Sequence, residues 1–477
     1  VREEVGRDFC VGLRITGDEF HPDGLNHDDM KEIAAYYNAT GEIDYFGVVG
    51  SGCDTHNTLA NVIPNMSYPP EPFLHLAAGI KEVVDVPVIH AQNIKDPNQA
   101  KRIVEAGYVD FVGMTRAHIA DPHLIAKIKM DQVDQIRQCV GANYCIDRQY
   151  QGLDVLCIQN AATSREYMGL PHIIEKTTGD VRKVVVVGGG PGGLESARVA
   201  AERGHNVTLI EKAEELGGQI TLASKAPQRD QIAGITRWLV MELERLGVDI
   251  RLGTAADAEL VRELKPDVCV IATGGRPFID QNPEWGAEEG LVISSWDILS
   301  GKVEPGNNVL IYDTICEFSG MSAADYLASK GSLVELVTDD IKPGVGIGGT
   351  TFPTYYRSLY EKEVIMTSDF LLEKVYREGD SLVAVLENEY TGQREERVVD
   401  QVVVENGTRP NEELYYALKE ESRNKGQIDN DALFDIKPQP VLEESGDGMI
   451  LWRLGDCVSQ RNTHAAMYDA LRLCKDL

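Results

Sequence analysis

The chain has 477 residues, of which 43% are hydrophobic and 26% charged, and 76 acidic against 46 basic residues give a formal net charge of −30. So large an acidic excess argues against nucleic acid and anionic membrane surfaces as partners. No apolar run reaches the length of a membrane span, and the nine cysteines are scattered except for one short cluster. We therefore expect a cytoplasmic protein of two or three domains, in a reducing compartment and not inserted in a membrane.

The first 138 residues alternate short apolar stretches with helical patterns. Strands are expected within 11–16, 44–50, 86–92 and 110–116. Asp96-Pro97 and Asp121-Pro122 each combine a helix-capping residue with a first-turn proline, which predicts a helix start. Four βα units are half of a (β/α)8 barrel, and alone they would leave sheet edges exposed. We expect residues 1–138 to be the second half of such a barrel, strands 5–8, with the first half absent from this sequence.

A linker over 139–180 carries the clustered cysteines, within CVGANYCIDRQYQGLDVLC at 139–157. Cys139, Cys145 and Cys157 are the kind of closely spaced thiols that hold iron–sulfur clusters. Where a fourth ligand is expected the chain has Ala142, whose side chain has no donor atom. The segment is therefore predicted to be an altered iron–sulfur site, and whether a cluster is bound stays open.

A glycine-rich turn follows the strand VVVV at 184–187 and opens a helix. Gly188, Gly190 and Gly193 form G-x-G-x-x-G, which permits a tight turn and lets backbone N–H groups approach a pyrophosphate. Glu211 ends the next strand, where a carboxylate accepts hydrogen bonds from ribose hydroxyls. The alternative is a glycine turn in an α/β protein that binds no ligand. We expect a dinucleotide-binding domain over 181–300, completed by 440–477.

Two further signals resemble the flavin-dinucleotide site of disulfide-reductase-like flavoproteins. Gly217-Gly218 follows the acidic residue, and Gly455-Asp456 follows a strand near the end of the chain. The resemblance implies FAD, or its ADP half, as the ligand.

A second strand–helix–strand unit lies in a domain expected over 301–439. When it is aligned on the first unit, Asp313 replaces the first glycine and Ile315 the second, while Gly320 is kept and Thr338 replaces the acid. A carboxylate and a branched side chain in the turn would keep a pyrophosphate from the backbone N–H groups. We expect this unit to bind no NAD(P)H; an unusual NADPH loop is the alternative.

The order of half-barrel, cysteine segment and double module resembles trimethylamine dehydrogenase and bacterial 2,4-dienoyl-CoA reductase, of the old-yellow-enzyme superfamily. The stretches CVGANYCIDR, VVVENGTRPNEELYYALK and GDCVSQRNTHAAMYDALRLCKDL are similar to the dimethylglycine and N-methylproline demethylase branch. This family fold is α/β and implies FMN in the barrel, FAD or ADP in the rear module, and a 4Fe–4S cluster. Ala142 falls on the family's second cluster ligand, so a 3Fe–4S cluster, a cluster with a distant fourth ligand, or no cluster remain possible.

The resemblance also implies roles for barrel residues. Arg14 would lie over the flavin pyrimidine, where a cation stabilises negative charge near N1. The other FMN contacts would come from the loops after the last two strands, namely Gln92, Asn93, Thr115 and the phosphate-binding Arg116. Surface ion pairing is the alternative for either arginine. Asp54, His56 and Tyr68 are catalytic candidates, for which loop solvation is an equal explanation.

The function that the family likeness implies is flavin-dependent oxidative N-demethylation of a small methylated amine or amino acid. The products would be formaldehyde and the demethylated amine, with electrons passing to a protein acceptor or partner subunit in a homo- or hetero-oligomer. An NADPH-dependent enoyl reductase of the 2,4-dienoyl-CoA type is the second interpretation. A degenerate subunit that only docks partners is the third, and the complete turn at 188–193 argues against it.

Overall fold

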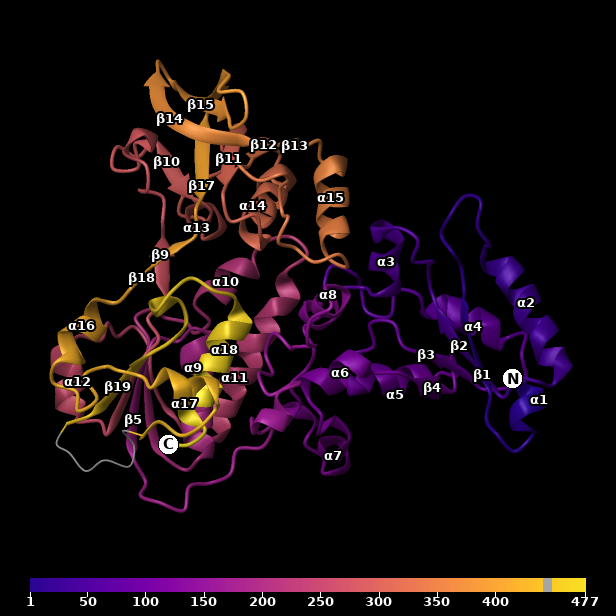
Figure 1. Cartoon of the computed structure of the whole chain (residues 1–477). Coiled ribbons are helices and arrows are strands. Elements are labelled where there is room, and N and C mark those ends of the chain that lie inside the picture. The colour runs from indigo at the N-terminus through magenta and orange to yellow at the C-terminus, as the bar shows by residue number, and fades with distance from the viewer. Residues whose placement is uncertain (441–447) are drawn as a thin grey trace. The chain divides into compact units, whose positions relative to one another are not determined.

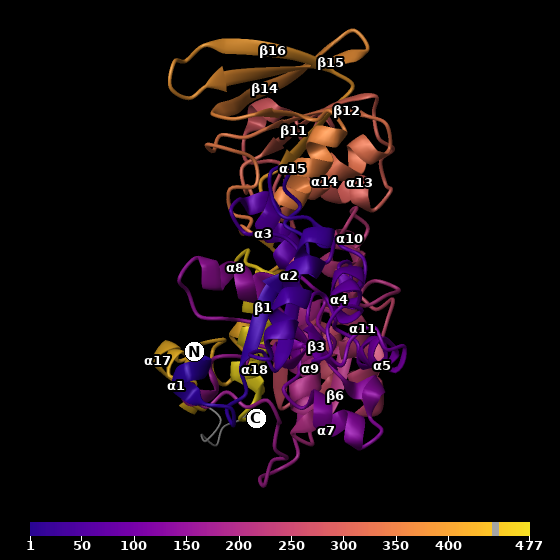
Figure 2. The ribbon, with the colours of Figure 1, turned by 90° about the vertical axis from the view of Figure 1, so that its right-hand side faces the viewer.

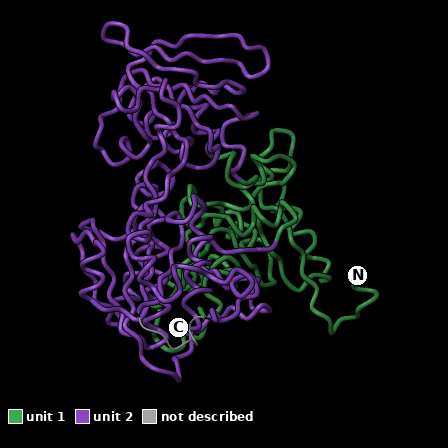
Figure 3. The backbone as a smooth tube through the Cα atoms, turned by 60° about the vertical axis from the view of Figure 1, so that its left-hand side comes forward, with its two compact units in different colours: residues 1–153, 348–354 green, residues 154–347, 355–477 purple. Residues whose placement is uncertain are grey.

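The computed structural model describes residues 1–440 and 448–477, which form two compact units (Figure 3). Unit 1 holds residues 1–153 and 348–354, and unit 2 holds residues 154–347 and 355–477. The four predicted parts, bounded at 138, 180, 300 and 439, are finer than these units, and that division stays a prediction. Residues 441–447 of the predicted closing segment lie outside the described residues. Residues 348–354 belong to unit 1, although they fall inside the predicted second dinucleotide domain.

Unit 1 is built on a parallel sheet whose strands follow each other in chain order, β1-β2-β3-β4 (Figure 1). The strands are β1 (Gly12–Thr16), β2 (Tyr45–Val49), β3 (Val88–His90) and β4 (Phe111–Val112). The helices between and after them are α2 (His27–Thr40), α4 (Leu74–Lys81), α5 (Pro97–Glu105), α6 (Thr115–Ala120) and α7 (Leu124–Lys129). The predicted series of four βα units is therefore confirmed.

Strand alternation decides which side chains of this sheet join the core. Leu13 and Ile15 pack with the buried Phe46 and Val48 in the core cluster that also contains side chains of α2 and α4. Arg14 lies between the two core positions of β1, so its side chain takes the opposite face and is exposed.

Two details of unit 1 differ from the sequence-based expectation. The fourth strand is shorter than 110–116, because Thr115 already begins α6. Asp96 caps α5 as predicted, in a capping box with Gln99. Asp121 instead ends α6, and its buried carboxylate accepts hydrogen bonds from the backbone N of Arg137 (3.0 Å) and from Lys127 Nζ (2.6 Å).

The first sheet of unit 2 is parallel, with the order β19-β8-β5-β6-β7. Its strands are β5 (Lys183–Val187), β6 (Asn206–Ile210), β7 (Asp249–Arg251), β8 (Val268–Ile271) and β19 (Ile450–Arg453). Helix α9 (Pro191–Glu202) packs against α11 (Ala233–Arg245) and α18 (Thr463–Cys474). The continuous burial of residues 184–187 is typical of a parallel strand covered on both faces.

The second sheet of unit 2 has the order β10-β17-β11-β12-β13, and a three-stranded antiparallel sheet, β14-β15-β16, forms a further layer against it (Figure 2). Its parallel strands are β10 (Val292–Ser294), β11 (Asn308–Asp313), β12 (Leu333–Val337), β13 (Ile365–Thr367) and β17 (Gln401–Glu405). The antiparallel strands are β14 (Phe370–Glu378), β15 (Ser381–Asn388) and β16 (Arg394–Val399). The small pair β9 (Gly275–Pro277) and β18 (Thr408–Pro410) connects the two parallel sheets along the chain.

Further helices complete both units. They are α1 (Arg2–Val5), α3 (His56–Val62), α8 (Tyr144–Tyr150), α10 (Gln219–Ala223), α12 (Ala258–Leu264), α13 (Ser295–Leu299), α14 (Phe318–Ser329), α15 (Phe352–Glu361), α16 (Glu413–Lys419) and α17 (Asn430–Phe434). Within the described residues, none of the helices combines the length and the apolar character that crossing a membrane requires.

Candidate functional site

The glycine turn between β5 and α9 is packed so tightly that two of its glycines cannot be replaced. Gly188 has a φ of 111°, and a Cβ there would fall on the carbonyl group of Ala272. A Cβ on Gly193 would fall on the carbonyl oxygen of Gly188. Gly190 differs, because it is the N-cap of α9 and a Cβ on it would meet no atom within 4 Å. Two glycines thus close the turn, and the third leaves open space at the start of a twelve-residue helix.

Glu211 lies directly at this turn, at the end of β6. Its Oε2 accepts a hydrogen bond from Gly189 N at 2.6 Å, and its Oε1 accepts one from Ala213 N at 2.8 Å. A carboxylate can accept about four hydrogen bonds, so about two positions remain for a ligand. Gly217 (φ 127°) donates its N–H to Gly189 O at 2.8 Å, which joins the Gly217-Gly218 pair to the same turn.

Asp456 reaches this end of the sheet from β19, two strands away from β5. Its Oδ2 accepts a hydrogen bond from Gln219 Nε2 at 2.8 Å, which links it to α10 beside Gly218. Burial raises the pKa of Asp456, and the hydrogen bond from Gln219 partly opposes that shift. The preceding Gly455 has a φ of 66°.

The three signals therefore meet at the carboxyl ends of parallel strands. From β5 the chain continues to β6 on one side and later to β8 on the other, which makes β5 a topological switch point. Open α/β sheets bind ligands at such a point, outside the carboxyl ends of the strands. A helix N-terminus with a free approach to Gly190 suits the phosphates of a dinucleotide.

The corresponding turn after β11 is filled by its own side chain. Asp313 is fully buried, and its Oδ1 accepts hydrogen bonds from the backbone N atoms of Ile315 and Cys316, each at 3.0 Å. Its Oδ2 lies against Gly320, where any Cβ would collide with the carboxylate. A carboxylate thus takes the N–H groups that a phosphate would need.

A second buried carboxyl group stands beside Asp313. Glu405 ends β17 in register with Asp313 and accepts a hydrogen bond from the Ser295 hydroxyl. Burial raises the pKa of Asp313 to about 7, and burial also raises that of Glu405 to about 7. Two buried acids at the strand ends disfavour a polyanionic ligand there.

In unit 1 the two predicted flavin arginines are placed very differently. Arg14 is exposed on the sheet face opposite the helices, beside Gly47 of β2. Arg116, in the first turn of α6 after the exposed Thr115, donates from Nη1 to Pro64 O (2.7 Å) and to Asn143 Oδ1. Both positions are compatible with the predicted roles, which stay predictions.

Gln92 and Asn93 are buried after β3 and hold the long loop that follows β2. Gln92 Nε2 donates to the carbonyl oxygens of Gly50, Asn61 and Val62, and Gln92 Oε1 accepts from Gly50 N. Asn93 (φ 56°) donates from Nδ2 to Pro69 O at 2.8 Å, whereas its buried Oδ1 has no partner among the described residues. Asn93 therefore keeps one acceptor for a ligand, and Gln92 mainly shapes the loop.

The three catalytic candidates lie along that same loop. Asp54 accepts a hydrogen bond from the Thr58 hydroxyl at 3.0 Å, which lowers the pKa of Asp54. His56 begins α3, with its ring 5.2 Å from that of Phe352. Tyr68 donates its hydroxyl to Asn61 Oδ1 at 2.6 Å. Their catalytic roles stay predictions.

All three clustered cysteines carry free thiols. Cys139 and Cys145 belong to unit 1 and Cys157 to unit 2. Cys139 Sγ accepts a hydrogen bond from Gly141 N at 3.4 Å, and the backbone oxygen of Cys157 contacts His464 Nδ1 at 2.6 Å. Across residues 1–440 and 448–477, no three His, Cys, Asp or Glu side chains come together as ligands for a metal ion.

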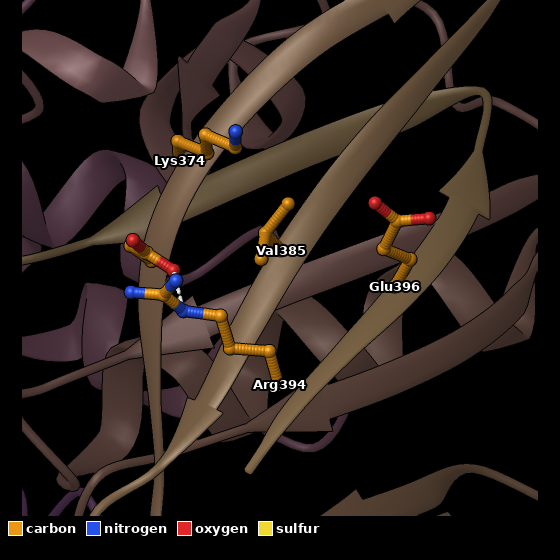
Figure 4. Close-up of a pocket in the computed structure, with 5 residues that line it drawn as sticks. Lys374, Val385, Arg394 and Glu396 are labelled. Atoms are coloured by element: carbon orange, nitrogen blue, oxygen red, sulfur yellow. Dashed lines mark ion pairs between the residues drawn. The ribbon is translucent and has the colours of Figure 1, made fainter. Parts of the chain in front are cut away.

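A hollow elsewhere in unit 2 is lined by charged groups that already have partners (Figure 4). It lies on β14, β15 and β16, over Lys374, Val385 and Glu396, and Arg394 forms an ion pair with Glu373 at 2.8 Å. We assign it no catalytic role, because these charges compensate each other on an antiparallel sheet.

The sequence did not reveal three buried residues around Arg116. Asn143, Asp147 and Thr350 are hydrogen-bonded to one another in a chain that ends on Arg116. The only local signal is Asn143, since asparagine is enriched in the left-handed conformation that it adopts here (φ 55°).

Comparisons with known proteins agree with this architecture. Residues 1–135 match the NADH:flavin oxidoreductase / NADH oxidase family, and residues 182–469 match the family described as pyridine nucleotide-disulphide oxidoreductase. The N,N-dimethylglycine/sarcosine dehydrogenase of Chromohalobacter salexigens is 76% identical over all of this chain and 70% of its own length. A Rhizobium meliloti protein named "Probable N-methylproline demethylase" is 43% identical, with the same coverage of 100% and 70%.

A solved structure of 2-naphthoyl-CoA reductase superposes with a TM-score of 0.85 at 25% identity, covering 100% of this chain and 66% of its own. The expected α/β fold, with barrel-type βα units ahead of a two-part dinucleotide-binding module, is thereby confirmed. The chain belongs to the family of flavin oxidoreductases that includes the N,N-dimethylglycine/sarcosine dehydrogenase of C. salexigens, and it is an oxidoreductase.

Proposed function

We propose that this protein is a flavin-dependent oxidative N-demethylase whose substrate is a small methylated amine or amino acid of the dimethylglycine or N-methylproline kind. The names of the two relatives that match the whole chain support this substrate class. The observation that carries the proposal is the buried Asp313 carboxylate, which accepts the N–H groups of the second turn. Because that turn cannot hold a pyrophosphate, the electrons come from an amine rather than from NAD(P)H at this module.

The residues present fit FAD, or its ADP half, in the first module. Gly190 leaves room for close approach of phosphates, and Glu211 and Asp456 offer carboxylates at the strand ends. Gly188, Gly217, Gly218 and Gly455 have positive φ angles, which other residues resist, and Gly193 allows α9 to pack closely against the carbonyl oxygen of Gly188.

FMN is the second proposed cofactor, in the barrel of unit 1. Arg14 would stabilise negative charge at the pyrimidine, and Arg116, with Thr115, would bind the phosphate. Asn93 would contact the flavin through its Oδ1, which has no partner among the described residues and can accept a hydrogen bond from an N–H group. When bound, FMN supplies the acceptor for a hydride equivalent from the N-methyl carbon. Cys139, Cys145 and Cys157 are proposed to hold no four-thiolate cluster, since Ala142 has no donor atom.

The substrate-facing residues are proposed to be Asp54, His56 and Tyr68, on the loop and helix that follow β2. The lowered pKa of Asp54 keeps its carboxylate ionised at neutral pH, which suits it to attract a cationic amine. Oxidation needs the neutral amine, so a proton must leave the nitrogen near this loop. Electrons are proposed to pass to a protein acceptor or partner subunit within an oligomer.

Formaldehyde release tests the proposal. The purified holoprotein is given dimethylglycine, sarcosine or N-methylproline with an artificial electron acceptor, and formaldehyde is measured against acceptor reduced. One formaldehyde per two electrons is expected from at least one of these amines. Glycine betaine is the matched control, because its quaternary nitrogen has no lone pair to support hydride loss. Acceptor reduction without formaldehyde would contradict N-demethylation.

Reduction of an enoyl thioester is the second candidate, because one similar structure is that of a 2-naphthoyl-CoA reductase. It requires NADPH to reduce the protein's flavin. Oxidation of NADPH by the holoprotein in the presence of a 2,4-dienoyl-CoA would favour it over demethylation.

A further inference from the structure

Asn143 is a buried residue that connects three separate segments of unit 1. It is 2% exposed and stands just before α8 in a left-handed conformation. Its Nδ2 donates to Ile63 O at 2.9 Å and to the Thr350 hydroxyl at 3.0 Å, and its Oδ1 accepts from Arg116 Nη1. Since a carbonyl oxygen can only accept and an arginine can only donate, these partners fix the orientation of the amide.

The amide also fixes the guanidinium of Arg116. Both N–H groups of Nη1 are taken, one by Asn143 and the other by Pro64 O at 2.7 Å. The three N–H groups on Nε and Nη2 have no hydrogen-bond partner in the part of the chain that the structure describes, and a guanidinium can bind a phosphate with two of them. Asn143 therefore determines which edge of Arg116 is presented to an anion.

The chain of hydrogen bonds continues to a buried carboxylate on α8. The Thr350 hydroxyl donates to Asp147 Oδ1 at 2.8 Å, and Asp147 also accepts from Thr350 N (2.8 Å) and the Thr351 hydroxyl (3.0 Å). A Cβ on Gly348 would collide with this carboxylate, so the segment 348–354 lies directly against α8. The guanidinium of Arg116 and the carboxylate of Asp147 thus lie at the two ends of a chain of hydrogen bonds through neutral groups. In such a chain each hydrogen bond polarises and strengthens the next.

On the basis of the proposed function, in which Arg116 contacts the FMN phosphate, we infer that Asn143 is a positioning residue for that phosphate. Thr350 and Asp147 keep its amide in place. The cysteine segment, which has Ala142 in place of a thiolate, thereby has a second role, because it orients the phosphate-binding arginine. This role depends on the left-handed Asn143 and not on any cysteine.

The test compares FMN with riboflavin, which lacks the phosphate. Flavin is removed from the holoprotein, and the dissociation constants of both ligands are measured by fluorescence quenching. Asn143→Gly keeps the left-handed backbone while removing the amide. It is expected to weaken FMN binding about 10- to 100-fold and riboflavin binding less than about twofold, as expected for losing a hydrogen bond to a charged group. Asp131→Gly, at an exposed left-handed position (φ 58°), is the matched control and should change neither constant.

Thr350 supplies an independent second comparison. Thr350→Val should weaken FMN binding selectively, and Thr350→Ser, which keeps the hydroxyl, should restore it. Equal losses for FMN and riboflavin in Asn143→Gly, or no loss at all, would overturn the inference. If the unaltered protein bound FMN and riboflavin equally well, Arg116 would not be a phosphate contact, and the inference about Asn143 would fail with it. The demethylase proposal would not be affected, because it is decided separately by formaldehyde release.

Discussion

Replacing Gly190 by alanine separates the ligand-binding role of the glycine turn from its structural role. Gly190 has φ −76° and ψ 177°, which alanine adopts without strain, and its Cβ would meet no atom within 4 Å. The free energy of unfolding should therefore stay the same or rise by about 0.4–1 kcal/mol, because alanine restricts the unfolded chain. The new methyl group would instead occupy the space through which a pyrophosphate approaches the backbone.

The expected loss in binding follows from the hydrogen bonds at stake. Displacing a phosphate from even one backbone N–H costs about 1.5–3 kcal/mol, which corresponds to about 10- to 100-fold weaker ADP binding. Gly193→Ala should behave differently, because its Cβ would fall on the carbonyl oxygen of Gly188 and neither backbone segment can yield easily. Overpacking of that kind costs about 1–3 kcal/mol, so stability and binding should fall together.

The assay is calorimetric titration with ADP, alongside thermal unfolding of the same flavin-free protein. Gly179→Ala, at an exposed glycine whose nearest atom to a new Cβ would be Thr177 Oγ1 at 3.6 Å, serves as the control for both measurements. Wild-type affinity for ADP in a stable Gly190→Ala protein would refute the placement of the pyrophosphate over this turn.

Single side chains give three more tests. Burial raises the pKa of Asp313 from 3.8 to about 7. Between these pH values the native chain retains a proton that the unfolded chain releases, so the free energy of unfolding should fall as the pH rises from about 4 to 7. Asp313→Asn should reduce that slope in thermal midpoints measured between pH 5 and 7.5, leaving the part that comes from Glu405, and an unchanged slope would show that Asp313 titrates normally. Glu211→Gln keeps an acceptor for Gly189 N but loses the charge, so calorimetry should show about tenfold weaker ADP binding at unchanged thermal stability; unchanged affinity would exclude a ribose contact. Arg14→Ala removes an exposed side chain, so flavin content and thermal midpoint should stay constant while amine-driven flavin reduction, followed by stopped flow, slows about 100-fold; an unaltered rate would remove Arg14 from the site.

Features set by local spacing could be predicted from the sequence. The turn at 188–193 depends on glycines two and three residues apart between a strand and a helix, and the structure has that arrangement. The four βα units follow equally from apolar periodicity. Asp96-Pro97 begins a helix as expected, because the Asp96 carboxylate has a local partner in Asn98 N.

Features set by long-range contacts could not be predicted. The dipeptide at Asp121 is the same, and Asp121 Oδ1 also accepts from the backbone N two residues on, that of His123 (3.0 Å). Its Oδ2, however, accepts from Lys127 and from the backbone N of Arg137, and the next helix begins only at Leu124. Asp147 and Thr350 are 203 residues apart in the chain, and although Asp147 lies in the stretch CVGANYCIDR, nothing in the sequence pairs it with Thr350. The second turn could be predicted only in part. The sequence shows that Asp313 replaces a glycine there, but it does not show that the Asp313 carboxylate accepts hydrogen bonds from the N–H groups of its own turn.

Electrons are proposed to enter this flavoprotein from an N-methylated amine and not from NAD(P)H. The decisive measurement is the anaerobic flavin absorbance of the holoprotein, with dimethylglycine, sarcosine or N-methylproline added to one sample and NADPH or NADH to another. We predict bleaching of the flavin band by at least one amine and none by either pyridine nucleotide. If NADPH or NADH bleached the flavin band and none of the amines did, the proposed electron source would be wrong. That result would also show that the turn at Asp313 does not prevent the protein from accepting electrons from a pyridine nucleotide.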